Sequence, residues 1–173
     1  MSFSFSGKCP KKQPEKGGKM DERIVVPLDG SKVGEAALPY VEDLVSKLSP
    51  EVKIEVILLQ VLSPESVPTV GGRAHAATPY TEREMEQIEK KATDYLNQAG
   101  EALRRKGVTV TARVAIGDAS EEIVKAAEEL NANMIAMSTH GRSGLSRWAF
   151  GSVTDRVLRR EGRIPILVVR APR

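Results

Sequence analysis

The chain has 173 residues, of which 40% are hydrophobic and 28% charged, and its formal net charge is +3. This length suits one domain with a buried core and is too short for two full domains. Acidic and basic residues are interspersed over most of the chain, so the charge pattern predicts no nucleic-acid surface. The single cysteine, Cys9, excludes a disulfide framework or a cysteine metal site within one chain, and we expect a reducing, cytoplasmic location.

Residues 1–19 differ in composition from the rest of the chain. They are rich in Lys, Gly, Ser and Pro and lack periodic apolar positions, so we expect a disordered basic tail before a domain at 20–173. Met20 directly precedes the first predicted strand of that domain, which favours a misassigned start or an added segment over an arm that contacts an acidic partner. The longest apolar run, residues 56–62, is too short to span a bilayer, and we expect no membrane partner and no targeting segment.

Apolar periodicity predicts alternating strands and helices along the domain. The predicted strands are residues 24–29, 52–62, 108–115, 134–137 and 164–169. The predicted helices are residues 31–48, 81–106, 118–130 and 152–160. This order indicates an α/β fold, a single doubly wound, Rossmann-like domain with an open parallel sheet of five strands and helices on both faces.

Local signals refine three of these segments. Asp118 and Glu121 have the spacing of a capping box at the start of their helix. Gly107 is placed to end the long helix 81–106. Between the second strand and that helix, residues 63–79 carry three prolines and two adjacent glycines, a composition typical of a lid or an interface segment.

The stretch 137–153 has the order strand, glycine-rich loop, helix start. Glycines let a backbone approach a phosphate, and unpaired amides at a helix start point at it, so this order predicts an anion site. Ser152 is expected to cap the helix and to donate its hydroxyl to a bound oxygen. Asp29 and Ser138 end the first and fourth strands and meet if those strands are neighbours. The alternative for Asp29 is a cap of the following helix.

The loop matches neither a P-loop nor Gly-x-Gly-x-x-Gly, and Gly141-Arg-Ser-Gly144 is weak by itself. Its spacing resembles the nucleotide-binding branch of the universal stress protein family, in which Gly-x-x-Gly, nine residues and Gly-Ser/Thr follow one another. Here Ser138 to Gly141, then residues 142–150, then Gly151-Ser152 occupy those positions. Pro-x-Asp-x-Ser at residues 27–31 and the terminal Ile-Pro-Ile-Leu-Val-Val support the resemblance, which covers residues 20–171.

The resemblance implies an adenine nucleotide alpha hydrolase-like sheet that binds ATP, with Mg²⁺ bridging the phosphates. Asp29 would meet the ribose or adenine side, and the backbone of Val61 would hold the adenine edge. Ser138 replaces the first glycine of the family pattern, which adds a Cβ near the ribose. The implied binding residues are Pro27, Leu28, Asp29, Val61, Ser138, Gly141, Arg142, Gly144, Gly151, Ser152 and Val153.

Other side chains of the loop have two interpretations each. Arg142 and Arg147 either reach the phosphates or lie in solvent, with at most one contact favoured. Trp148 and Phe150 are expected to pack the loop against the domain rather than to stack on a base. His140 precedes Gly141, and a loop-fixing hydrogen bond is favoured over a general base, since no serine, cysteine or metal cluster pairs with it.

Three functions are compatible with this sequence, and none has an assigned catalytic residue. The favoured one is a nucleotide-binding regulatory module of the stress response. A slow ATPase or nucleotidyl-transfer enzyme is the second, but the loop lacks a phosphate lysine and a water-activating base. The third is a nucleotide-free dimer. The last strand, from Ile164 to Val169, is apolar with Pro165 near its start, which predicts an edge strand and a homodimer through it.

Overall fold

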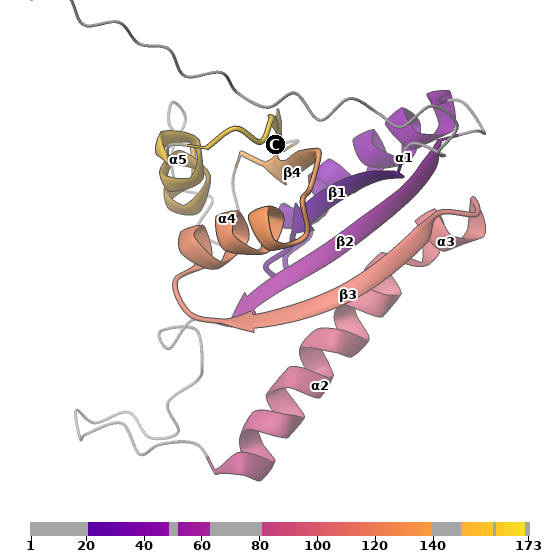
Figure 1. Ribbon diagram of the computed structural model, residues 1–173. Coiled ribbons are helices and arrows are strands. Elements are labelled where there is room, and N and C mark those ends of the chain that lie inside the picture. Colours follow the sequence, from indigo (N-terminus) through magenta and orange to yellow (C-terminus); the bar gives the residue numbers. More distant parts are fainter. Residues whose placement is uncertain (1–20, 49–51, 63–80, 140–149, 161, 172–173) are drawn as a thin grey trace, which may run out of the picture.

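The computed structural model describes residues 21–48, 52–62, 81–139, 150–160 and 162–171. Within these ranges five strands form one sheet in the order β3-β2-β1-β4-β5, and every neighbouring pair is parallel (Figure 1). The strands are β1 Asp21–Pro27, β2 Lys53–Leu62, β3 Thr109–Ile116, β4 Met134–Ser138 and β5 Ile166–Val169. The predicted parallel α/β sheet is therefore confirmed.

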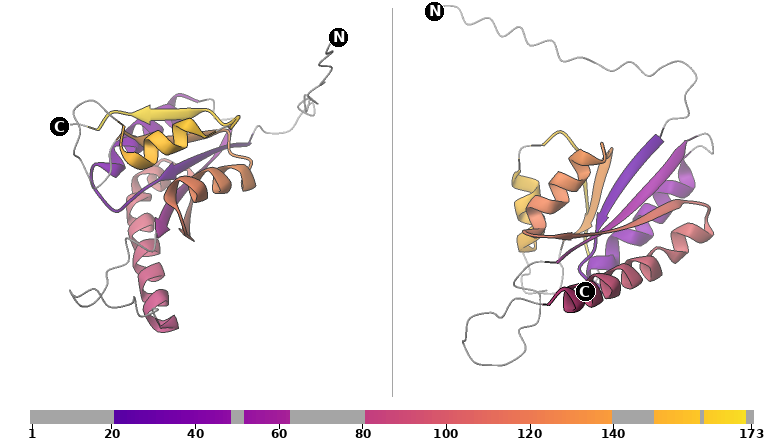
Figure 2. Two further views of the ribbon diagram at one scale, coloured as in Figure 1. Left: turned by 90° about the vertical axis from the view of Figure 1, so that its left-hand side faces the viewer. Right: turned by 60° about the horizontal axis from the view of Figure 1, so that its bottom comes forward.

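Helices cover both faces of the sheet, as the two further views show (Figure 2). A 3₁₀ turn, η1 Gly34–Ala37, leads into the first helix. The helices are α1 Leu38–Lys47, α2 Glu82–Ala99, α3 Glu101–Arg105, α4 Ala119–Glu129 and α5 Ser152–Arg159. The first three helices lie on one face, and α4 and α5 lie on the other.

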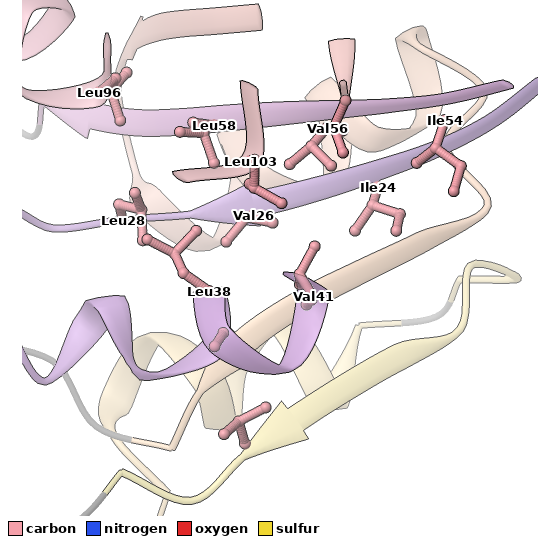
Figure 3. Packing of buried hydrophobic residues seen from close by; sticks show 14 residues of the cluster. Ile24, Val26, Leu28, Leu38, Val41, Ile54, Val56, Leu58, Leu96 and Leu103 are labelled. Carbon is pink, nitrogen blue, oxygen red and sulfur yellow. The ribbon is translucent and has the colours of Figure 1, made fainter. Parts of the chain in front are cut away.

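The core consists of two apolar clusters separated by the sheet. Side chains of successive strand residues point to opposite faces, so Val26 joins the cluster under α1 and α2 while Val25 joins the cluster under α4 and α5. Both valines are fully buried. In the first cluster Leu96 of α2 and Leu103 of α3 lie with Leu58 of β2 (Figure 3). Continuous apolar strands are what this two-sided burial requires.

The predicted helix 81–106 is divided at Gly100 into α2 and α3. A Cβ on Gly100 would lie 2.8 Å from Cγ1 of Val110, so this residue lets the helices pack closely on β3. The start of α2 carries a capping box that sequence analysis missed. Thr81 Oγ1 accepts from the Glu84 amide at 3.4 Å, and Glu84 Oε2 accepts from the Thr81 amide at 2.8 Å.

The predicted capping box of α4 is only half correct. Asp118 is the N-cap, and its Oδ1 accepts from the amides of Ser120 at 2.9 Å and Glu121 at 3.1 Å. The carboxylate of Glu121 accepts instead from Arg160, the C-cap of α5, at 2.7 Å. A partner from another helix has replaced the local bond, which the spacing alone does not reveal.

The strand order changes direction beside β1. The chain passes from β1 to β2 and β3 on one side, and β4 and β5 lie on the other. The predicted pairing of the first and fourth strands is confirmed, with Val25 opposite Ile135. Ligand sites of open parallel sheets lie at such a switch point, outside the carboxyl ends of the strands.

Candidate functional site

A cavity of about 260 Å³ opens at the carboxyl ends of β1, β2 and β4. Eight of the predicted binding residues line it together: Pro27, Leu28, Asp29, Val61, Ser138, Gly151, Ser152 and Val153. The remaining predicted residues, Gly141, Arg142 and Gly144, lie outside the described residues, as do His140 and the other loop side chains up to residue 149. The structure thus places segments far apart in sequence around one space.

Six further residues line the cavity, and sequence analysis missed all of them: Gly34, Leu59, Ala119, Ile123, Met137 and Thr154. Leu59 and Met137 belong to β2 and β4, whereas Ala119 and Ile123 come from the first turns of α4. They give the cavity an apolar wall. Their helical or strand periodicity marks them as core residues, so no sequence signal separates them from the rest of the core.

Asp29 is held by the turn that follows β1. Its Oδ1 accepts from the Ser31 amide at 3.0 Å and from the Ser31 hydroxyl at 2.6 Å. The Ser31 hydroxyl oxygen in turn accepts from the Gly34 amide at 3.0 Å. The N-cap of the 3₁₀ turn is Val33, without a capping side chain, so the interpretation of Asp29 as a helix cap is wrong. The carboxylate is oriented at the cavity by its own turn.

Gly34 allows this turn to close on Asp29. A Cβ built on Gly34 would lie 2.3 Å from Oδ1 of Asp29, well inside any normal contact. Only a residue without a side chain fits there while the carboxylate keeps its position. The sequence signal for this role is the glycine five residues after the aspartate, which is too common a spacing to be specific.

Tyr95 joins α2 to the same turn. Its hydroxyl donates to Oε1 of Glu35 at 3.2 Å. Burial raises the pKa of Tyr95 far above its ordinary value, and the negative charges of Glu35 and Asp29 raise it further. The phenol therefore stays neutral and remains a hydrogen-bond donor at any physiological pH.

The two ends of the glycine-rich segment are joined at their base. The Gly151 amide donates to the carbonyl of Thr139 at 2.6 Å. The Thr154 hydroxyl donates to the carbonyl of Ser138 at 2.9 Å, and both residues are buried. Helix α5 is thereby fixed to the end of β4. Phe150 is 48% exposed, so its ring is not packed into the domain as expected.

Helix α5 starts at Ser152 as predicted, but its N-cap lies one residue before the predicted one. Gly151 is the N-cap and Ser152 is the first helical residue, so Ser152 does not cap the helix. Glycine offers no side chain to the first-turn amides, and no side-chain cap is present. These amides, whose residues line the cavity, have no partner within the helix itself. The positive end of the helix therefore borders the cavity.

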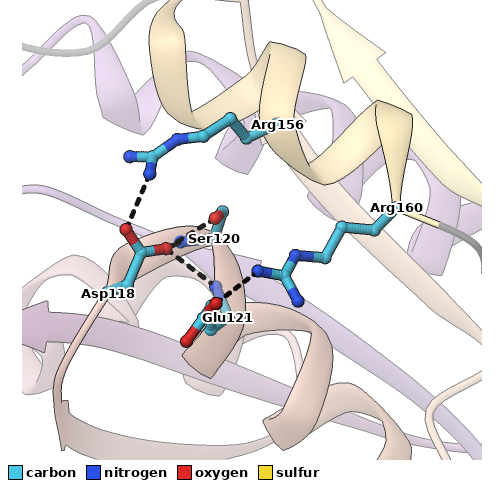
Figure 4. Close-up of polar contacts among 5 residues, drawn as sticks. All are labelled: Asp118, Ser120, Glu121, Arg156 and Arg160. Carbon is cyan, nitrogen blue, oxygen red and sulfur yellow. Dashed lines mark hydrogen bonds and ion pairs between the residues drawn. The ribbon is translucent and has the colours of Figure 1, made fainter.

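Two ion pairs join α5 to α4 beside the cavity (Figure 4). Arg156 Nη1 donates to Asp118 Oδ2 at 2.7 Å, and Arg160 Nη2 donates to Glu121 Oε1 at 2.7 Å. The hydroxyl of Ser120, the amide of Glu121 and the guanidinium of Arg156 lower the pKa of Asp118 to about 2. Asp118 is therefore ionised at neutral pH.

Neither a metal cluster nor a membrane helix is found in the part of the chain that the structure describes. No group of three or more His, Cys, Asp or Glu residues there has the arrangement of a metal site. None of the helices in the same ranges combines the length and apolar character needed to cross a bilayer.

The fold and the loop spacing can be compared with known proteins. A sequence model of the universal stress protein family matches residues 20–170. The chain belongs to the universal stress protein family. This confirms the predicted resemblance to the family as a whole.

Relatives of this universal stress protein align along most of their length. Universal stress protein MJ0531 of Methanocaldococcus jannaschii is 28% identical over 157 residues, covering 91% of this chain and 86% of that protein. Universal stress protein MJ0577 of the same organism is 28% identical over 160 residues, with coverages of 87% and 96%. Its solved structure matches with a TM-score of 0.72 at 26% identity, covering 87% of this chain and 96% of that one.

A plant protein of the family shows the same fold at lower identity. The structure of an Arabidopsis thaliana universal stress protein with AMP bound matches with a TM-score of 0.59 at 16% identity. The match covers 87% of this chain and 92% of that one. It establishes the shared α/β architecture.

Proposed function

We propose that this universal stress protein binds ATP in the strand-end cavity and acts as a regulatory module of the stress response, in the cytoplasm. The observation that carries the proposal is the cavity itself. It brings Asp29, an apolar wall and the uncapped start of α5 together at the switch point of the sheet. An adenine nucleotide has a flat base, a ribose and an anionic tail, which correspond to these three elements.

The apolar side of the cavity suits the base. Leu59 is fully buried, Ile123 and Met137 are nearly so, and Val61 lies at the end of β2 with its backbone at the rim. Ligand sites are typically lined by apolar side chains with a few polar groups that set orientation. In the proposal the backbone of Val61 holds the adenine edge, and the apolar side chains enclose its faces.

The polar groups of the cavity suit the ribose and the phosphates. A carboxylate such as Asp29 accepts hydrogen bonds from ribose hydroxyls. The first-turn amides at Ser152 and Val153 suit phosphate oxygens, because a helix start combines free N–H groups with a positive dipole end. Gly141, Arg142 and Gly144 would complete the phosphate site, with Mg²⁺ bridging the phosphates. The AMP found in the plant relative belongs to the same class of ligand.

Calorimetric titration of the full chain with ATP and Mg²⁺ tests the proposal. We expect binding by the wild type and a loss of at least tenfold in affinity for Gly151→Val, which puts a branched side chain at the helix start. Gly162→Val is the matched control, because a Cβ on Gly162 meets no atom within 4 Å. If the wild type does not bind any adenine nucleotide, or Gly151→Val binds as the wild type does, the proposal fails.

We also infer that two copies pair through β5. This strand is an edge of the sheet, and its residues Ile166, Leu167 and Val168 are only partly buried in the single chain. An apolar edge strand invites pairing with a second strand. Sedimentation equilibrium at micromolar concentration should give the mass of a dimer. A monomer at that concentration would refute this inference.

A further inference from the structure

The ion pairs between α4 and α5 connect two walls of the cavity. Ala119 and Ile123 of α4 line one side, and Ser152 and Val153 of α5 line another. Asp118, the N-cap of α4, directly precedes Ala119. The ion pairs of Arg156 and Arg160 thus link the helix that carries the apolar wall to the helix whose start borders the cavity.

Asp118 is a well-defined acceptor for Arg156. Its Oδ1 accepts from the Ser120 amide at 2.9 Å and from the Ser120 hydroxyl at 2.6 Å, and its Oδ2 accepts from Arg156 at 2.7 Å. One oxygen therefore fixes the carboxylate to its own helix while the other holds α5. Arg156 lies one turn after Ser152, so its position and that of the first-turn amides are mechanically linked.

We propose that Asp118 and Arg156 form a positioning latch that holds the start of α5 at the cavity in the place where it meets the anionic part of the ligand. This inference rests on the proposed nucleotide binding. Thr154 fixes the inner side of α5 to β4 through the Ser138 carbonyl. The latch fixes the outer side to α4, and Arg160 with Glu121 reinforces it one turn further along. Neither arginine touches the ligand in this proposal.

The competing explanation is a simple electrostatic effect of Arg156 on an anionic ligand. The two explanations predict opposite changes in the ligand affinity of the Asp118→Asn variant. Asp118→Asn keeps an oxygen for the helix cap, since asparagine caps as well as aspartate, but puts an amide where Arg156 needs an acceptor. The variant also removes a negative charge beside the cavity. A field effect then predicts tighter binding of an anion, whereas a latch predicts weaker binding.

The experiment compares ATP and adenosine as titrants of the full chain in a low-salt buffer. We expect Asp118→Asn and Arg156→Gln each to weaken ATP binding about two- to fivefold, the range in which partly exposed ion pairs act. Adenosine binding should change less than ATP binding. The double variant should lose no more than either single variant, because the latch is already open.

Arg159→Gln is the matched control for charge. Arg159 lies on the same helix but pairs with Asp155 of that helix at 2.8 Å, so its removal changes the net charge equally and leaves the latch intact. Tighter ATP binding by Asp118→Asn would overturn the proposal. Equal losses for Arg156→Gln and Arg159→Gln would overturn it as well.

Hydrogen exchange of the ligand-free protein keeps the latch testable apart from the proposed function. Opening the latch should speed exchange of the amides in α5 at least twofold in Asp118→Asn and Arg156→Gln relative to Arg159→Gln. Unchanged exchange rates would refute the latch even if ATP binds. Absence of nucleotide binding by the wild type, together with faster exchange in the two variants, would refute the proposed function and leave a latch that orders α5 alone.

Discussion

Gly34→Ala is the most direct test of how the turn after β1 presents Asp29. The added Cβ would lie 2.3 Å from Oδ1 of Asp29, 3.2 Å from its Cγ and 3.3 Å from the Ser31 hydroxyl. Ordinary contact begins at 3.4 Å, so the carboxylate oxygen has to move by about 1 Å, 3.4 minus 2.3. A shift of this size breaks a hydrogen bond of normal length.

The expected effect on stability is modest, since two contributions oppose each other. Inserting a methyl group into a packed turn costs about 1–3 kcal/mol. Replacing glycine by alanine at a helical position recovers up to about 1 kcal/mol. We therefore expect the free energy of unfolding of Gly34→Ala to fall by about 1–2 kcal/mol, measured by urea denaturation. The variant should remain folded.

The effect on the ligand should be larger. If Asp29 accepts a hydrogen bond from the ribose, losing that bond costs about 1.5–3 kcal/mol, or roughly a tenfold to hundredfold loss of affinity. Calorimetry with ATP and with 2′,3′-dideoxy-ATP separates this bond from the rest of the site. The wild type should favour ATP, and Gly34→Ala should bind the two ligands about equally.

Gly162→Ala is the control for this variant. Gly162→Ala, whose Cβ meets no atom within 4 Å, should match the wild type in stability and in affinity. A folded Gly34→Ala protein that binds ATP with wild-type affinity would show that the position of the Asp29 carboxylate does not matter for the ligand.

Three further predictions concern pH, a buried hydroxyl and the core. The pKa of Asp118 is lowered from 3.8 to about 2 on folding, so its stabilising contribution is present above pH 3.8 and is lost as the pH falls towards about 2. Urea denaturation of the wild type and Asp118→Asn should therefore give unfolding free energies that differ by less than about 1 kcal/mol at neutral pH, as expected for a partly exposed pair. This difference should vanish as the pH is lowered from 3.8 to about 2. Tyr95→Phe should lower the unfolding free energy by about 1 kcal/mol, because it removes the bond to its carboxylate partner, whereas Tyr40→Phe at a 58% exposed site should have no effect. Because the pKa of Tyr95 is raised from 10.0, the stability that it contributes is present below pH 10 and should fall as the pH rises further. Leu58→Ala, at a fully buried site, should lower the unfolding free energy by about 2–5 kcal/mol. Leu48→Ala, at a site that is 38% exposed, should lower it by less than about 0.5 kcal/mol. Equal losses in the two variants would argue against the assigned core.

The sheet and its rim were accessible from the sequence because they depend on local patterns. Apolar runs predicted four strands of the described sheet, and the alternation of apolar and polar residues over 108–115 predicted the remaining one, β3. The ends of the first and fourth strands carried Asp29 and Ser138, and a parallel sheet brings such ends to the same edge. The pairing of β1 with β4 was conditional in the sequence, since strand order is decided by how helices cover the two faces.

The features that the sequence did not reveal depend on contacts between distant segments. Gly34 is required by the place that Asp29 takes, which only the folded turn defines. The bond from Tyr95 to Glu35 joins residues 60 positions apart. Glu121 has the spacing of a capping box, yet it pairs with Arg160 because α5 packs beside α4. Local sequence spacing indicates which partners a side chain can have, and tertiary packing determines which of these partners it contacts.

A short hydrogen bond joins the Gly151 amide to the Thr139 carbonyl. These two residues flank residues 140–150 in the sequence, and the bond holds them together. We therefore expect that residues 140–150 can be replaced without loss of the fold. Replacing this segment with the corresponding segment of another family member should alter ligand preference while the unfolding free energy of the domain stays nearly constant, so ligand choice and fold stability can evolve separately in this protein.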